Sequence, residues 1–357
     1  MNMINNTPRT RLIDTNFITE WTVGAGDSVT LPLITGNTYT FTVTWGDGAS
    51  NIITAFDDAD RIHTYTNAGT YTVKIEGINE RWDFNSVATS KDKITKVLNW
   101  GDVGWTSMAD AFYDCTNLIS TSTGGTYLSG IDMFSYMFYG CANLAFMSSI
   151  DSSFGSDFSN MFQSCTVLVS LPAVFDLSSA ASCSFMFINC QNLTTLPDLN
   201  SGSCGSFSFM FINCISLISL PTIFDVSSGT NFSAMFFHCI SLISLPTIFD
   251  VSSGTNFSAM FLECTSLISL PTIFDVSLGT NFTDMFKDCP NLSSGTLQGC
   301  KATISIEDCD FDKAGLEAFA NDLGDGTGQT WTVTGNPGAA TFDDSVAVGK
   351  NWTVVRS

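Results

Sequence analysis

The chain has 357 residues, of which 44% are hydrophobic, and it carries a formal net charge of −21. The apolar content and the 30 phenylalanines exclude a disordered chain, and the length predicts two or three structural units. Residues 101–286 contain no Lys or Arg. Because phosphate backbones and anionic lipids are bound by clustered basic side chains, this composition argues against nucleic acid or an anionic membrane surface as a partner.

The first segment, "MNMINNTPRTRLIDTNFITEW", has no apolar stretch long enough for the core of a signal peptide. No run in the chain approaches the ~18 apolar residues of a membrane span, so we expect no membrane insertion. We assign residues 1–13 to an N-terminal arm. We expect a chain that is made in the cytoplasm and reaches a virion or an extracellular surface by assembly into a particle.

Residues 14–85 carry motifs typical of β-strands. "YTFTVTWGDG" covers residues 39–48, and "IHTYTNAGTYTVKIEG" covers residues 62–77. The Trp-Gly-Asp-Gly turn and the His-x-Tyr and Gly-Thr-Tyr-x-Val strands resemble those of a polycystic-kidney-disease-type (PKD) domain. The resemblance implies an N-terminal β-sandwich over residues 14–85.

Cysteine marks an internal repeat over the middle of the chain. Eight cysteines follow one another at spacings of 26, 24, 25, 24, 25, 25 and 25 residues: Cys115, Cys141, Cys165, Cys190, Cys214, Cys239, Cys264 and Cys289. A fixed period of this size is typical of a solenoid, in which each coil buries its apolar face on its neighbours. We therefore expect a solenoid of about eight coils of 24–26 residues over residues 86–300.

Each repeat predicts the same short elements. The pattern C-x-x-L-x-x-L-P indicates a strand that ends at its Pro, because Pro withholds a backbone amide hydrogen. "FDVSSGTN" is rich in turn-forming residues. "NFSAMF" is interpreted as a short helical turn that returns Phe and Met to the core. The predicted fold class is mainly β with short helical turns.

The repeat unit "SLPTIFDVSSGTNFSAMFFHC", with Met-Phe-x-x-Cys and a following x-x-Leu, resembles the BspA-like leucine-rich repeats of bacterial surface proteins. The resemblance covers about residues 101–300. It implies adhesion and display on a surface. The remaining residues, 301–357, predict a small α/β cap with a helix near residues 312–323 and strands at "QTWTVTG" and "NWTVV".

The eight ladder cysteines are interpreted as reduced, buried structural thiols, since a small apolar side chain suits every rung alike. Cys183 and Cys204 lie off the ladder at the same place in successive coils, and a disulfide between them is the alternative. No C-x-x-C or His pairing indicates a metal site.

A second column is acidic and consists of Asp176, Asp225, Asp250 and Asp275. Each Asp begins a turn whose amides its side chain can accept, so turn capping is favoured over calcium binding. We expect no cofactor anywhere. Calcium is the alternative in the N-terminal domain, where Asp47 and the cluster Asp57, Asp58 and Asp60 supply carboxylates.

Catalysis has little support in the sequence, and we expect no enzymatic activity. Of the two histidines, His63 lies in a motif that the PKD resemblance makes structural, and His238 occupies a position that other repeats fill with Asn, Glu or Asp. No nucleophile elbow, phosphate loop or zinc signature is present.

The two residues before each ladder cysteine vary between repeats while the core positions do not, which predicts a recognition stripe across the coils. The stripe consists of Tyr113, Tyr139, Gln163, Ile188, Ile212, Phe237, His238, Leu262, Glu263, Lys287 and Asp288. Packing on an adjoining loop explains the same positions equally well. A second stripe lies between the two Leu of each repeat and consists of Ile119, Ala145, Val169, Thr194, Ile218, Ile243 and Ile268.

These observations favour a non-enzymatic adhesion or receptor-recognition protein, with a bacteriophage tail or capsid fibre as the first hypothesis. The expected partner is a host cell-surface glycan or protein, besides other virion or surface proteins. A structural subunit that decorates a virion or self-assembles into a homo-oligomer is one alternative. A bacterial BspA-like adhesin on a cell surface is the other.

Overall fold

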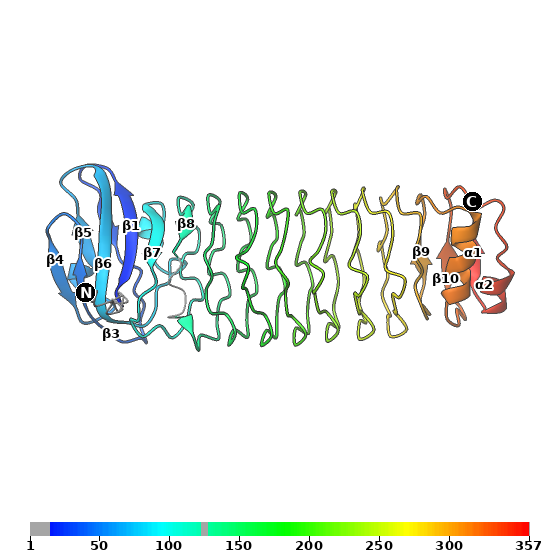
Figure 1. The fold of residues 1–357 in the computed structure, drawn as a ribbon, viewed down its shortest axis with the longest axis horizontal. Coiled ribbons are helices and arrows are strands. Elements are labelled where there is room, and N and C mark those ends of the chain that lie inside the picture. Colours follow the sequence, from blue (N-terminus) through cyan, green and yellow to red (C-terminus); the bar gives the residue numbers. More distant parts are fainter. Residues whose placement is uncertain (1–14, 123–127, 357) are drawn as a thin grey trace, which may run out of the picture.

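The computed structural model describes residues 15–122 and 128–356, so the predicted N-terminal arm lies outside the described residues. The molecule is a rod, with a β-sheet unit at one end, stacked coils along its length and two helices at the other end (Figure 1). It is mostly β with few helices, as the sequence predicts. None of the helices in residues 15–122 and 128–356 has the length and apolar character needed to traverse a bilayer.

The N-terminal unit consists of short antiparallel strands. They are β1 (Phe17–Val23), β2 (Ser28–Thr30), β3 (Tyr39–Thr44), β4 (Ser50–Ile53), β5 (Ile62–Thr64), β6 (Gly69–Asn79) and β7 (Ile94–Asn99), with 3₁₀ turns η1 (Ala59–Arg61) and η2 (Ala88–Ser90). One sheet has the order β4-β3-β6-β1-β7-β8, in which β8 (Ser120–Thr121) belongs to the first coil, and β2 pairs separately with β5.

Alternating apolar residues direct one face of this sheet into an aromatic core. On β1, Phe17 and Trp21 are fully buried. The Phe17 ring meets Trp82 edge to face at 4.7 Å between centroids. Trp45 stacks on His63 at 4.9 Å. The motif His-x-Tyr is thus structural, because the His63 ring covers a core tryptophan.

The solenoid grows directly from the last strand of this sheet. β7 pairs antiparallel with β1 and, on its other edge, parallel with β8 (Ser120–Thr121). Ile119 N donates to Thr95 O at 2.9 Å across the same edge. The first coil therefore uses the sheet as its template.

The C-x-x-L segment forms a turn, and the prediction of a strand from C-x-x-L to Pro is wrong. Leu242 N donates to Cys239 O at 3.0 Å and closes the turn. The coils then meet at single parallel bridges, Ser219↔Ser244, Ser244↔Ser269 and Ser269↔Ser294. Pairing stays this short because the turn precedes each bridge and Pro follows it two residues later.

The "NFSAMF" segment is a series of turns, and the prediction of a helical turn is also wrong. The backbone has φ of 49° at Ala234 within the segment and 59° at His238 two residues after it, which a right-handed helix does not allow. Alternate amides leave the coil instead: Phe232, Ala234, Phe236 and His238 donate to Asn256, Ser258, Met260 and Leu262 of the next coil at 2.8–2.9 Å. Hydrogen bonds between coils therefore replace helical ones.

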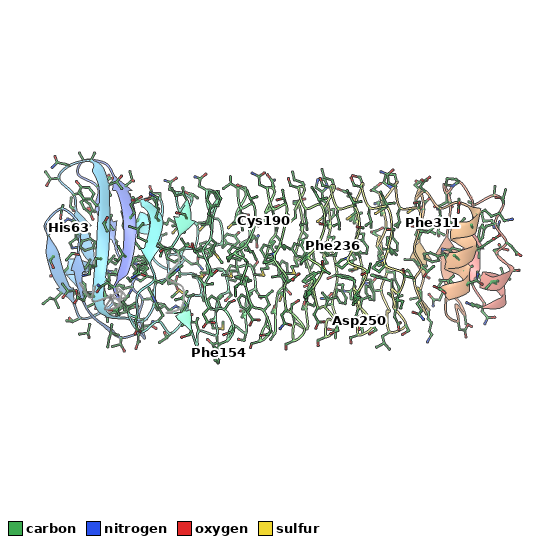
Figure 2. The ribbon with its side chains drawn as sticks, viewed as in Figure 1. His63, Phe154, Cys190, Phe236, Asp250 and Phe311 are labelled. Carbon is green, nitrogen blue, oxygen red and sulfur yellow. The ribbon has the colours of Figure 1, made fainter. Side chains whose placement is uncertain are left out.

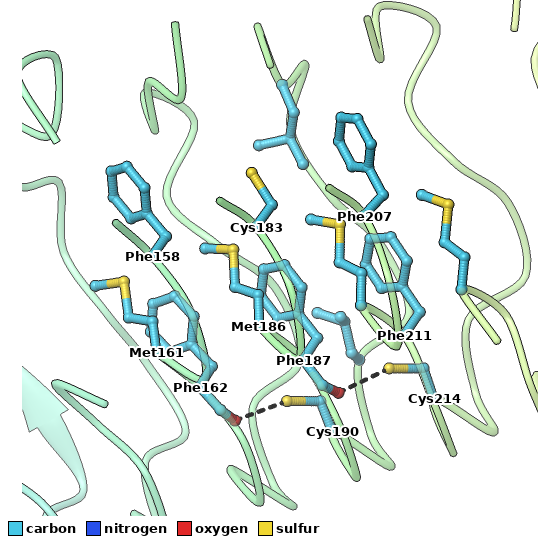
Figure 3. Close-up of a cluster of buried hydrophobic side chains, with 14 of the residues drawn as sticks. Phe158, Met161, Phe162, Cys183, Met186, Phe187, Cys190, Phe207, Phe211 and Cys214 are labelled. Atoms are coloured by element: carbon cyan, nitrogen blue, oxygen red, sulfur yellow. Dashed lines mark hydrogen bonds between the residues drawn. The ribbon is translucent and has the colours of Figure 1, made fainter. Parts of the chain in front are cut away.

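The interior consists of columns of identical side chains (Figure 3). Phe187, Phe211, Phe236 and Phe261 stack in succession with centroids 5.4–5.6 Å apart. Every ladder thiol after Cys115 donates to the carbonyl oxygen of a Phe in the preceding coil; Cys239 Sγ lies 3.0 Å from Phe211 O. The cysteine ladder is thus a hydrogen-bonded column as well as a packed one.

The C-terminal cap contains β9 (Ile304–Ser305), α1 (Lys313–Asp322), β10 (Thr330–Thr332), α2 (Ser345–Gly349) and β11 (Thr353–Val355). The predicted helix and both predicted strands are confirmed. The Asp312 carboxylate caps α1 by accepting Gly315 N at 2.7 Å. Asp310 N donates to Leu292 O of the last coil at 2.9 Å, so the cap covers the end of the rod (Figure 1).

Candidate recognition surface

Exposed branched side chains recur in two columns along the solenoid, and we call these columns the isoleucine face. The first column was predicted and contains Val169, Ile218, Ile243 and Ile268. The second was not predicted and contains Val174, Ile223, Ile248 and Ile273. The second column is the more exposed, since Ile248 is 80% exposed and Ile273 is 68% exposed.

Alternation along "TIFD" places the second column on the surface. Phe249 points inward, is 2% exposed and stacks on Phe274 of the next coil at 6.4 Å. Ile248 precedes it and therefore points outward, as alternate residues of an extended segment do. Burial of Phe249 thus fixes the exposure of Ile248.

The acidic column lies beside the isoleucines and caps turns, as predicted. Asp225, Asp250 and Asp275 each accept the amide of the Ser two residues later, at 3.0, 3.0 and 2.9 Å. Asp176 does the same at 2.8 Å. Asp151, which the sequence analysis missed, accepts Ser153 N at 3.2 Å. Each cap holds a turn and fixes one carboxylate at the same edge of the rod.

The isoleucines and aspartates together line shallow grooves between coils. One groove of about 350 Å³ is lined by Thr247, Ile248, Asp250, Ser252, Ile273 and Asp275, besides Phe249. A second, of about 340 Å³, lies one coil earlier and contains Ile223, Asp225 and again Ile248 and Asp250. The surface therefore repeats with the coil, and a long ligand could contact several repeats.

The face is apolar and acidic at once. Residues 101–286 contain no Lys or Arg that could neutralise the aspartates. Figure 2 places Asp250 at the same edge of the rod as Phe154, which is 63% exposed in the turn of an earlier coil. A partner on this edge would meet negative charge next to aliphatic surface.

The predicted recognition stripe is half-buried, apart from the exposed Lys287 and Asp288 at its end. Two of its side chains are seen to meet their counterparts in the next coil. Tyr113 stacks on Tyr139 with centroids 4.5 Å apart, and burial together with that neighbour raises the pKa of Tyr113 to about 12. His238 Nδ1 lies 2.5 Å from Glu263 Oε2. The positions Gln163, Ile188, Ile212, Phe237 and Leu262 are likewise half-buried.

Backbone geometry explains the polar character of the position before each ladder cysteine. Every residue there has a positive φ, between 54° and 70°: Asp114, Gly140, Ser164, Asn189, Asn213, His238, Glu263 and Asp288. Gly, Asn and Asp tolerate this left-handed conformation better than branched residues do. The enrichment of this position in Asn, Asp and Gly was the sequence signal of that backbone conformation.

Two of the carboxylates offered for calcium in the N-terminal unit, those of Asp47 and Asp58, accept hydrogen bonds. Asp47 accepts Ala49 N at 3.0 Å and approaches His63 Nε2 at 2.8 Å, and these contacts lower the pKa of Asp47. Asp58 accepts Asp60 N and Thr54 N, each at 3.1 Å, which lowers its pKa in turn. Among the described residues, no three or more His, Cys, Asp or Glu side chains gather where they could hold a metal ion. The absence of a cofactor stays a prediction, and calcium in this unit stays its alternative.

The thiols of the ladder are poorly suited to nucleophilic chemistry. Burial raises the pKa of Cys289 to about 12 and raises the pKa of Cys239 further. A nucleophilic cysteine needs a thiolate and access to solvent, and the ladder provides neither. All twelve cysteines are buried and none forms a disulfide.

One protein-family model matches the repeated part of the chain twice. A family described as "Mycoplasma protein of unknown function, DUF285" matches residues 106–217 and again residues 195–298. No curated protein matches the chain. Among solved structures, the chain is similar to the TLR13–ssRNA13 complex, with 14% identity over 78% of this chain and 39% of that one and a TM-score of 0.29. It is also similar to a leucine-rich-repeat protein from Bacteroides ovatus, with 11% identity over 80% and 95% of the two chains and a TM-score of 0.20.

The chain thus spans well under half of the TLR13 chain that it matches. The two family matches fall on overlapping stretches of the solenoid and together cover more than half of the sequence. The coils that carry the predicted leucine-rich repeats are the part that is matched. The chain belongs to the DUF285 family, which is described as "Mycoplasma protein of unknown function".

Proposed function

We propose that the solenoid is a non-enzymatic recognition protein and that its isoleucine face binds a partner protein. The observation that carries the proposal is the repeated exposure of large aliphatic side chains at one position of successive coils: Ile223, Ile248 and Ile273. Single exposed apolar side chains are common on protein surfaces, but contiguous exposed apolar surface marks interaction sites. The interior does not require these side chains, since Phe249 and its counterparts fill it.

The chemistry of the face favours a protein with basic side chains over a glycan. Aliphatic side chains gain free energy by covering other apolar surface, and a polyhydroxylated glycan offers little of it. Asp225, Asp250 and Asp275 would attract Lys or Arg of the partner, because residues 101–286 contain no Lys or Arg of their own to compete for them. The proposed occupant is therefore a protein surface that combines apolar with basic side chains. The net charge of −21 disfavours a second copy of the same chain.

The biological role of the chain follows from the same proposal. A protein partner on a host cell would make the chain an adhesin, displayed by a virion such as a phage fibre or by a bacterial surface. The N-terminal unit would serve as a PKD-like base, supported by the Trp-Gly-Asp-Gly turn in which Asp47 caps Ala49. A structural subunit with about eight coils is the competing proposal, and it predicts assembly of the purified chain.

Binding to intact cells tests the proposal. Fluorescently labelled protein would be added to a panel of bacterial and animal cells that are untreated, shaved with protease or oxidised with periodate. Because the partner is a protein, we expect binding to at least one cell type to vanish after protease and to survive periodate. Flow cytometry measures both.

The surface is tested with a matched pair of variants. Replacing Ile223, Ile248 and Ile273 by Ser should weaken binding tenfold or more, since full burial of one such side chain contributes about 1.5–3 kcal/mol. The control replaces Phe237 and Leu262 of the recognition stripe by Ser and should bind as the parent does. The proposal would be overturned if only the control variant lost cell binding, or if binding survived protease treatment. It would also be overturned if the purified chain assembled into regular particles and bound no cell.

A further inference from the structure

One column of buried phenylalanines is interrupted in the middle of the solenoid. Phe207, Phe232, Phe257 and Phe282 stack in succession at 5.4–5.7 Å, and Phe134 stacks on Phe158 at 5.3 Å. Cys183 stands between Phe158 and Phe207 (Figure 3). It occupies the equivalent place in its coil, because the bridges Asp157↔Ser182 and Ser182↔Ser206 align the residues before all three. The column therefore has a thiol where a ring is expected.

A column of glycines packs against this column of phenylalanines. Four of these phenylalanines have a glycine three residues earlier, and a Cβ added to that glycine would collide with the ring: Gly155 before Phe158, Gly229 before Phe232, Gly254 before Phe257 and Gly279 before Phe282. At Gly229, it would lie 2.5 Å from Cζ of Phe232 and 2.9 Å from Cδ2 of Phe207 in the preceding coil. Glycine is required because two rings converge there.

The two coils around Cys183 depart from this rule together. Ala180 replaces the glycine of the same coil, and Cys204 replaces the glycine of the next coil. Both are fully buried. In these two coils Cys183 stands at the Phe position, and Cys204 stands at the Gly position of the next coil. The side chain of Cys204 therefore enters the volume that a Phe ring at position 183 would fill.

Hydrogen bonds show that the two thiols are neighbours. Cys183 N and Cys204 Sγ both donate to Ser206 O, each at 3.2 Å. The Cys204 sulfur therefore lies against the backbone of Cys183. A hydrogen bond between the two thiols, together with burial, raises the pKa of Cys183 well above its usual value.

We propose that Cys183 and Cys204 form a site for a disulfide that joins two successive coils. Oxidation would remove one hydrogen atom from each thiol and form one S–S bond, and the two electrons and two protons would pass to a small thiol oxidant such as the azo compound diamide, whose N=N bond becomes HN–NH. The bond would replace the ring contact that the column lacks between Phe158 and Phe207.

The ladder thiols are not expected to compete in this reaction. Each thiol from Cys141 to Cys289 in the ladder donates to a Phe carbonyl of the preceding coil, at 2.9–3.1 Å. Their sulfur atoms are thereby held toward the backbone. Cys183 is different because its thiol is hydrogen-bonded to the Cys204 thiol of the next coil.

The test refolds the full chain from denaturant in the presence of diamide, because Cys183 and Cys204 are fully buried in the folded chain and the reagent reaches them only before the coils close. The protein would then be denatured, alkylated with N-ethylmaleimide and analysed by mass spectrometry. Because the chain has 12 cysteines, we expect ten alkylated residues and the loss of two hydrogen atoms. Peptic peptides should contain Cys183 joined to Cys204; trypsin has no site nearby. The variant Cys183→Ser should keep all its thiols.

The packing of Cys204 in the space of the missing ring is tested separately, with variants that restore the Phe and Gly of the other coils. Cys183→Phe alone should lower the melting temperature by several degrees, because Cys204 occupies part of the ring's volume. Adding Cys204→Gly should recover the parent value. Full alkylation after diamide, or a cross-link between ladder cysteines, would overturn the disulfide site, and a single variant as stable as the double would overturn the shared volume.

Discussion

At the residue scale, two kinds of position decide the coil: rings that stack and residues with a left-handed backbone. Phe236 is fully buried between Phe211 and Phe261 at 5.6 Å on either side. His238 has a φ of 59° and donates its amide to Leu262 O at 2.8 Å. The first kind supplies apolar burial, and the second directs the amides to the next coil.

Replacing Phe236 by Ala should lower the free energy of unfolding by about 3–5 kcal/mol, because the cavity lies inside a continuous stack. Chemical denaturation followed by circular dichroism measures the change. The control is Ile248→Ala, which removes an exposed side chain and should change stability by less than about 0.5 kcal/mol. Equal losses in both variants would mean that the column is not the core.

Replacing His238 by Val should cost about 1–3 kcal/mol, since a β-branched residue is strained at positive φ. His238→Asn should cost less, because Asn tolerates that conformation. The same denaturation curves measure both variants, and Phe237→Val, one residue earlier, is the matched control. If Val at position 238 were as stable as Asn, the left-handed backbone would not determine the residue type there.

At the element scale, the unit is a coil whose hydrogen bonds run mostly to its neighbours. Thr255 N donates to Thr230 O at 2.9 Å and Thr280 N to Thr255 O at 2.8 Å, so successive coils are interchangeable. The variable pair Phe237-His238 and its counterpart Leu262-Glu263 meet through His238 and Glu263. The two nearly identical repeats thus differ at a coil–coil contact, in a half-buried stripe.

Exchanging these two pairs should leave stability within about 0.5 kcal/mol, since the ring and the carboxylate would still meet with their positions reversed. Thermal unfolding of the exchanged variant measures this. Replacing His238 and Glu263 by two glutamates is the informative comparison, because like charges would then face each other. A large loss in the exchanged variant would show that each side chain is specific to its coil.

Deleting residues 240–264 should give a folded rod that is shorter by about one inter-strand spacing, ~4.8 Å. The coils at the new junction carry the same interior residues, so every column stays in register. Small-angle scattering and circular dichroism measure length and folding. Deleting residues 240–251, half a coil, should unfold the array; if it did not, the coil would not be the unit.

The sequence predicted the interior of these elements better than their backbone. The period of Cys, Leu and Met-Phe specifies which side chains stack, because identical coils must bury identical residues. The left-handed φ of 49° at Ala234 has no such signal, since Ala is common everywhere and only the hydrogen bond to Ser258 O imposes the conformation. Ile248 was missed for a related reason: "TIF" looks uniformly apolar until Phe249 is seen to point inward.

At the scale of the whole molecule, one apolar core runs from the N-terminal sheet through the coils to the cap. Trp100 and Phe112 join the first two parts, with ring centroids 5.8 Å apart. At the other end, the Cys309 thiol lies 4.0 Å from Phe286 O. Both ends of the stack are therefore covered, which a solenoid needs to stay soluble.

Removing residues 301–357 should expose Phe286 and Leu292 of the last coil and cause association. Size-exclusion chromatography with light scattering would detect dimers or larger species at micromolar concentration. The shortened rod without residues 240–264 is the control, because it loses a coil and keeps its cap. A monomeric truncated chain would show that the cap is not needed to cover the stack.

The central claim is that the isoleucine face contacts a protein partner, and photo-cross-linking tests it most directly. A photoreactive phenylalanine analogue would replace Ile248 in one protein and Phe237 in another, and each would be irradiated on cells that bind the parent chain. We predict a cross-link from position 248 to a protein segment that contains Lys or Arg beside apolar residues, with little from position 237. A cross-link from position 237 alone, or attachment of position 248 to carbohydrate, would contradict the account.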